Sequence, residues 1–130
     1  MRLGMVTDGE FVKAFSQLMN SPSPIPTAYA LLILNAEVKK HMTDFDALRL
    51  KLISKYGEAD AEGNIIVVKS EDGKLGNYKM RDSDGFIKEY NELVNLEVPV
   101  SRIPLSAVEH IQLPPTQLSI LLASVILPDK

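Results

Sequence analysis

The longest uninterrupted helical pattern in the chain runs from Thr27 to Tyr56, a stretch that contains neither glycine nor proline. Pro26 suits the first position of a helix, and Gly57 stands where a left-handed C-cap is expected. At ~1.5 Å per residue, about 30 residues form a helix ~45 Å long. A compact globule of this chain length is only ~36 Å across. The predicted helix therefore spans or overshoots its own domain.

Apolar residues form a seam along this helix, because they recur at seven-residue steps with a second series between them. Three arrangements fit the seam: a break near Thr43 and Asp44, a protruding arm, or a helix whose far end packs on another subunit. An isolated arm with an exposed apolar seam would tend to associate with other molecules. An unbroken helix therefore predicts a homo-oligomer. The residues predicted to mediate self-association are Leu31, Leu34, Val38, Phe45, Leu48 and Leu52.

Shorter patterns surround the long helix. Thr7 and Glu10 are spaced as a capping box for a first helix that ends at Asn20, with Phe11, Phe15, Leu18 and Met19 on its apolar face. After Gly57 the β-branched run 65–69 and the run 75–80 predict two strands, joined by a tight turn at Asp72 and Gly73. These two strands predict a β-hairpin.

The last third of the chain predicts two more helices, one strand and a second extended piece over 103–105 and 111–113. Asp82 is placed to cap a helix that continues to Val94, and residues 96–101 alternate as a half-buried strand with Pro99 at an edge. Pro115 opens a C-terminal helix that Pro128 stops. The predicted fold class is α+β, a single domain over 1–130, in which N-terminal helices, a further helix and a C-terminal helix accompany a small antiparallel sheet with a hairpin.

Composition excludes several kinds of function. The chain has no cysteine, which removes disulfides, thiol nucleophiles and cysteine metal sites. Its formal net charge of -3 is not that of a general nucleic-acid binder. The most apolar stretch, 118–127, is far shorter than the roughly 20 residues that a membrane span needs. We therefore expect no nucleic-acid partner and no membrane association.

Candidate chemical sites are sparse. The acidic loop at Asp82 and Asp84 lacks the spacing of an EF-hand and predicts a turn with a helix cap. His41 has no second ligand on its helix face, and His110 lies in a predicted loop. Residues 73–76 carry two glycines but follow a hairpin turn and open no helix, so they form no phosphate cradle. The sequence predicts no catalytic, cofactor or metal site.

The order of several segments resembles a family of small tailed-bacteriophage proteins of unknown function. The resemblance covers Ser23–Ala30 before the long helix, Leu52–Asp60 with Gly63 and Asn64 after it, Phe86–Leu93, and Leu96–Val100, and it ends on a Leu-Pro-x-x-x-Leu helix start. Gln112 and Gln117 depart from it, because acidic residues are expected there. The resemblance implies a phage origin and brings no catalytic residue.

Two functions follow from these observations. The first is a non-enzymatic structural or assembly component of a phage particle, which acts through contacts with itself and with other virion proteins. The alternative is a non-structural phage protein that binds and inhibits a host factor, such as a defence protein or its signalling nucleotide. The corresponding locations are the virion and the host cytoplasm.

Overall fold

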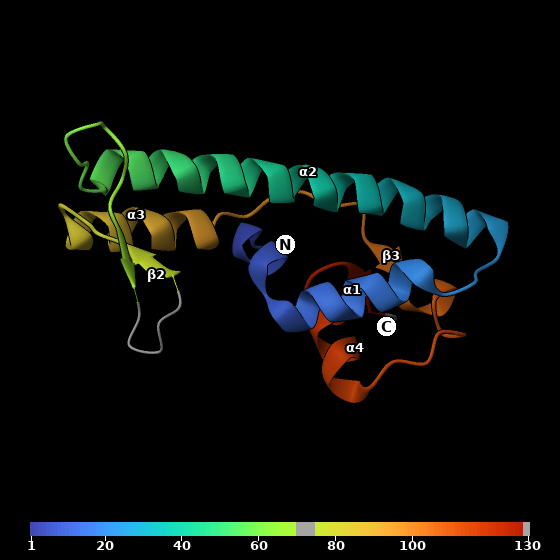
Figure 1. Cartoon of the computed structure of the whole chain (residues 1–130). Coiled ribbons are helices and arrows are strands. Elements are labelled where there is room, and N and C mark those ends of the chain that lie inside the picture. The colour runs from blue at the N-terminus through green and yellow to red at the C-terminus, as the bar shows by residue number, and fades with distance from the viewer. Residues whose placement is uncertain (70–74, 129–130) are drawn as a thin grey trace.

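One long helix organises the structure. The computed structural model describes residues 1–69 and 75–128, and its dominant element is α2 (Ile25–Tyr56), a helix of 32 residues. In Figure 1, α2 runs along one side of the molecule, α3 (Ser83–Val94) lies beside its C-terminal half, and α1 (Gly9–Asn20) and α4 (Pro115–Leu122) gather near its N-terminal half. The described part of the chain is therefore elongated along α2.

The long helix is unbroken, which excludes the predicted alternative of a break near Thr43. The Thr43 hydroxyl donates to the Lys39 carbonyl at 3.1 Å within α2 and caps no second helix. Gly57 ends α2 with φ of -72°, so the predicted left-handed cap is wrong. A Cβ at Gly57 would collide with the Ile53 carbonyl oxygen, which explains the glycine by close approach instead.

The first helix ends at Asn20 as predicted, but its N-cap differs from the predicted one. The Asp8 carboxylate accepts from the backbone N–H groups of Glu10 and Phe11 at 2.9 and 3.1 Å. Thr7 belongs to the 3-10 helix η1 (Leu3–Thr7), where its hydroxyl donates to the Gly4 carbonyl at 2.8 Å. A charged oxygen at the positive end of the helix dipole thus replaces the neutral cap.

The third helix begins as predicted and packs along α2. The Asp82 carboxylate accepts from the Gly85 N–H at 3.1 Å. Tyr90 of α3 stacks on Phe86, with ring centroids 5.6 Å apart, and meets the buried Phe45 of α2 edge to face at 6.2 Å. These aromatic contacts hold α3 against the C-terminal half of α2.

The predicted α+β fold with a small antiparallel sheet is wrong, because the structure is mostly helical. Its strands form two separate two-stranded pieces. The pair β1 (Val67–Lys69) and β2 (Leu75–Tyr78) is antiparallel with an irregular register, while β3 (Ile103–Pro104) and β4 (Ile126–Leu127) are parallel. The predicted hairpin turn at 71–74 lies outside the described residues. The helices bury their apolar sides mainly against one another, so no sheet provides the core.

The predicted strand 96–101 is instead an extended strap. The N–H of Leu3 donates to the Leu96 carbonyl at 2.7 Å, and the N–H of Val98 donates to the Met1 carbonyl at 2.9 Å. Among the described residues, the strap pairs as a strand with the N-terminus through the bridge between Arg2 and Glu97. The strap fastens the N-terminus beside α3.

The C-terminal region closes the core at the other end. Between β3 and α4, the 3-10 helix η2 (Leu105–Ala107) turns the chain, and α4 then packs against α1. Leu121, Val125 and Ile126 are fully buried. The buried Ser124 is satisfied, because its hydroxyl donates to the Ile120 carbonyl at 2.8 Å. The core is therefore continuous from η1 through α1 to the C-terminal strand.

We predict that Gly4→Ala destabilises the protein. A Cβ at Gly4 would collide with the Val94 side chain where η1 packs against α3, and overpacking of this kind costs about 1 to 3 kcal/mol. Gly9→Ala is the matched control, because a Cβ there meets nothing within 4 Å. Urea denaturation should show a lower midpoint for the first variant and an unchanged or higher one for the second. Equal midpoints would contradict the close packing of η1 on α3.

Candidate functional site

The structure places most of the predicted self-association seam inside the chain's own core. Leu31, Leu34, Val38 and Phe45 are buried, Leu52 is partly buried against the same core, and Leu48 is 38% exposed. The residues that cover this seam come from η1, α1 and α3. An apolar seam on a helix indicates that other residues pack against it. In this structure those residues belong to the same chain.

A different apolar surface of α2 is exposed. Ile25, Tyr29, Leu32 and Ile33, which we call the α2 stripe, are 82%, 65%, 64% and 41% exposed. Their spacing of three and four residues places them on one side of the helix over about two turns. Large contiguous apolar patches on a protein surface mark sites of interaction. The α2 stripe is therefore the candidate functional site.

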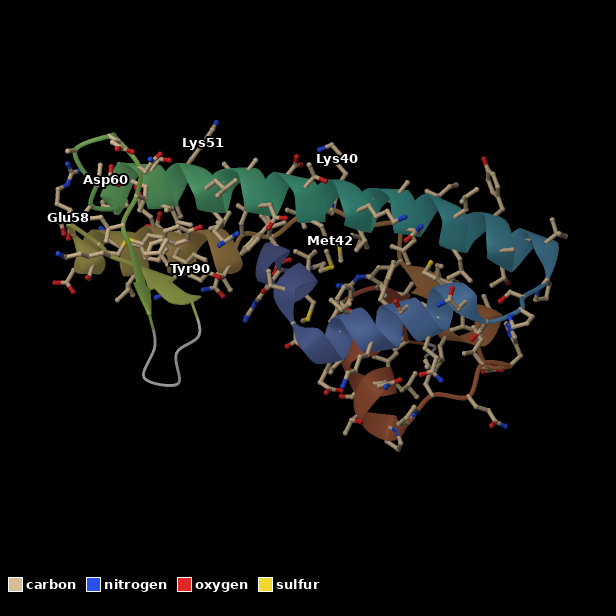
Figure 2. All side chains as sticks on the ribbon, viewed as in Figure 1. Lys40, Met42, Lys51, Glu58, Asp60 and Tyr90 are labelled. Carbon is tan, nitrogen blue, oxygen red and sulfur yellow. The ribbon has the colours of Figure 1, made fainter. Side chains whose placement is uncertain are left out.

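The charge pattern of α2 sets this surface apart. No charged residue occurs from Ile25 to Ala36, whereas the later part of the helix carries ion pairs such as Lys40 to Asp44 at 2.8 Å. Figure 2 shows Lys40 and Lys51 on the outer side of α2. The outer side is thus apolar near the N-terminus of the helix and polar beyond it. The absence of charge over 25–36 is the sequence signal that could have located the stripe.

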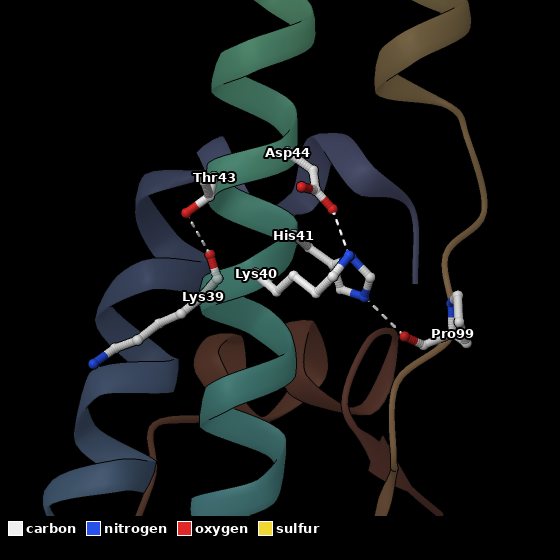
Figure 3. Close-up of polar contacts among 6 residues, drawn as sticks. All are labelled: Lys39, Lys40, His41, Thr43, Asp44 and Pro99. Carbon is white, nitrogen blue, oxygen red and sulfur yellow. Dashed lines mark hydrogen bonds and ion pairs between the residues drawn. The ribbon is translucent and has the colours of Figure 1, made fainter.

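His41 holds a backbone segment in place. Figure 3 shows His41 directed from α2 towards the strap, where its Nε2 lies 2.9 Å from the Pro99 carbonyl oxygen. One turn earlier, the Glu37 carboxylate accepts from the Ser101 N–H at 3.2 Å. The two side chains share one face of α2 and fix the strap along it. His41 therefore has a structural contact that fully accounts for one of its nitrogens.

His110 forms a pair that sequence reasoning missed. Its Nε2 lies 3.0 Å from the hydroxyl oxygen of Ser23, which comes from the proline-rich elbow 87 positions earlier. A serine beside a histidine is the beginning of a nucleophilic site, but such sites also need a group that orients the histidine. Among the described residues no carboxylate is bonded to His110, and the pair is exposed. We assign it no catalytic role.

A charged cluster lies where the end of α2 meets α3. The Lys55 ammonium donates to both oxygens of Glu89 at 3.1 and 3.3 Å and lies 5.1 Å from the centre of the Tyr56 ring. Hydrogen bonds from the Tyr56 hydroxyl and from Lys55 lower the pKa of Glu89. Hydrogen bonding to Glu89 raises the pKa of Lys55 and of Tyr56. The cluster is a surface latch between two helices, and no cleft encloses it.

Over residues 1–69 and 75–128, no group of three or more histidine, aspartate or glutamate side chains is arranged to hold a metal ion. In the same part of the chain, no helix has both the length and the apolar character that a membrane crossing requires.

Comparisons with family models, with curated proteins and with solved structures find no match for the chain. The resemblance to phage proteins therefore stays a prediction.

We predict that Phe45→Asp unfolds the protein. Phe45 is 1% exposed, so the variant buries an unpaired carboxylate and loses a ring, at a cost of about 4 kcal/mol or more. Leu50→Asp is the control, because Leu50 lies on the same helix and is 51% exposed. Circular dichroism during heating should show a lost or much lower transition for the first variant alone. A Phe45→Asp protein as stable as the parent would place Phe45 outside the core.

We predict that Glu89→Gln destabilises the protein only where Glu89 is ionised. The lowered pKa of Glu89 means that its contribution is present above the unfolded value of roughly 4.3 and is lost as the pH falls through the folded value. The raised pKa of Lys55 preserves its charge up to at least its unfolded value, about 10.4. The difference between the urea midpoints of parent and variant should be present at pH 7 and should shrink as the pH falls below about 4.3. A difference that stays constant as the pH falls would contradict an ionic latch.

Proposed function

We propose that the protein is a non-enzymatic phage protein that acts through protein–protein contacts as a structural or assembly component of a phage particle. The observation that supports a surface-acting role is the exposed, uncharged α2 stripe at the start of the long helix. A hydrophobic surface held on a rigid helix offers shape and apolar area to a partner. The phage context rests on the sequence resemblance.

The first partner that we propose for the stripe is a second copy of the same chain. The exposed parts of its four side chains amount to on the order of 500 Å² per copy. A two-fold pair then buries on the order of 1,000 Å² in total, which reaches the lower limit of specific interfaces. The neighbouring Ala28 and Ala36 are also exposed, and their small side chains permit close approach of two helices.

Charge is compatible with this pairing. A two-fold axis brings the same surface of both copies together, so a charged residue in the stripe would face a like charge across it. None occurs over 25–36. In an antiparallel arrangement the charged second half of each α2 points away from the partner's stripe, and the helix dipoles oppose each other favourably. Self-association then leaves the charged halves and α3 free to contact other particle proteins.

We predict that Leu32→Glu prevents self-association. Glutamate at this 64% exposed position places two like charges in the proposed interface without disturbing the core. Leu50→Glu is the matched control, because it is the same change on the same helix at a 51% exposed position outside the stripe. Sedimentation over a concentration series should show a dimer for the parent and the control and a monomer for Leu32→Glu. A parent protein that stays monomeric at all concentrations would contradict the proposal.

The phage assignment has its own test. Mass spectrometry of purified particles of the phage that encodes the chain should find the protein at a fixed ratio to the major particle proteins. Absence from the particles would contradict a particle component, whatever the oligomeric state in solution.

A further inference from the structure

A second surface feature lies at the opposite half of α2 from the stripe. A pocket of about 540 Å³ opens between α2, α3 and the end of β2. Its lining residues include Arg49, Ile53, Tyr78, Met80, Phe86 and Tyr90. The volume falls in the range of small-molecule sites, which are mostly apolar with a few polar groups that fix orientation. The proposed function leaves this pocket without a role.

One wall of the pocket is a preorganised aromatic surface. The rings of Phe86 and Tyr90 stack with an angle of only 19° between their planes. Phe45 supports Tyr90 from the core by an edge contact at 72°. Ile53 lines the pocket as well and is only 4% exposed. Because Phe45 and Ile53 are fixed in the core, the wall is rigid and suits a flat aromatic ring.

One cation completes the pocket. Arg49 comes from α2 and is 39% exposed, and among the described residues its ion-pair partner is Asp46, at the long distance of 4.0 Å. A guanidinium with so weak a partner retains donors for an anionic group. Arg49 is the one cation among the described lining residues, and with Asp46 close by it balances a single negative charge better than a multiply charged phosphate ester.

We infer that this pocket binds a small planar aromatic compound that carries one anionic group, with the ring on the wall of Phe86 and Tyr90 and the anion at Arg49. The inference is independent of the proposed function, because the stripe covers 25–33 and the pocket begins at Arg49. The proposed ligand is a small molecule. Occupation of the pocket by a side chain of another protein is a different outcome of the test.

Two matched probes test the ligand class. Anilinonaphthalene sulfonate has a flat naphthalene ring system and one negative charge, and phenylnaphthylamine is its uncharged counterpart. Met80 is the one methionine among the pocket's described lining residues, whereas Met19 lies in hollows beside the first half of α2. With methyl-labelled methionine, the sulfonate probe should shift the Met80 signal in NMR spectra at lower concentrations than any shift of Met19. No shift of Met80, or a shift of Met19 first, would overturn the inference.

A variant of Arg49 tests whether this residue binds the anionic group of the ligand. Arg49→Gln should weaken binding of the sulfonate probe about tenfold or more, because it removes a charge-assisted hydrogen bond, and should leave binding of the uncharged probe unchanged. Arg102→Gln, the same change at an exposed position outside the pocket lining, should alter neither. Urea midpoints show whether each variant is folded. Equal weakening of both probes, or of neither, would overturn the assignment of the anion to Arg49. If neither probe binds at the pocket and another protein does, the proposed ligand class is wrong.

Discussion

The rest of the structure depends on the burial of one side of α2. This side carries Leu31, Leu34 and Val38 in its first half and Phe45 and Ile53 in its second half, all of them buried. α2 packs with α1 and η1 and, further along, with α3, while α4 packs on α1. Two groups of elements are thus held by a single rigid helix, and the short 3-10 helix η1 joins them through its contacts with both α2 and α3.

This arrangement gives α2 two different outer surfaces. Where the helix carries Lys40 and Asp44, the outer side is solvated and its charges pair locally. Before Glu37 no charge is present, and Tyr29 and Leu32 are left exposed. The same helix therefore supports an apolar surface at one end and a pocket with one cation at the other. Because the helix is rigid, a partner bound at one end would be held at a defined distance from the other.

Local patterns predicted the helices well. The end of α1 at Asn20, the Asp82 cap of α3 and the extent of the helical pattern of α2 follow from caps, prolines and periodicity, which act within a few residues. Whether α2 breaks near Thr43 was left open by the same patterns. The sheet was mispredicted because strands need distant partners. Residues 96–101 alternate like a strand, yet within the described part of the chain they form a bridge with the N-terminus, and β3 pairs with β4 from the far end of the chain. Asp8 caps α1 in place of Thr7 because its carboxylate is charged. A motif defined by residue types alone does not include this difference in charge.

The candidate sites were harder to predict than the fold. Periodicity located the apolar seam of α2 correctly but could not identify what covers it, so residues of the chain's own core were assigned to self-association. The stripe at Ile25 to Ile33 had a simpler signal, the lack of charge. The contact of Ser23 with His110 and the pocket around Tyr90 and Arg49 join segments far apart in sequence, and no local pattern encodes them.

α2 is one unbroken helix that holds both groups of elements. Because the chain has no cysteine, a pair of introduced cysteines at the exposed positions Ala28 and Ala47 can be spin-labelled cleanly. In labelled protein diluted with unlabelled protein, pulsed electron resonance should give one narrow distance distribution, consistent with about 28 Å along the helix axis. A shorter or broad distribution would show a break near Thr43 and contradict the account.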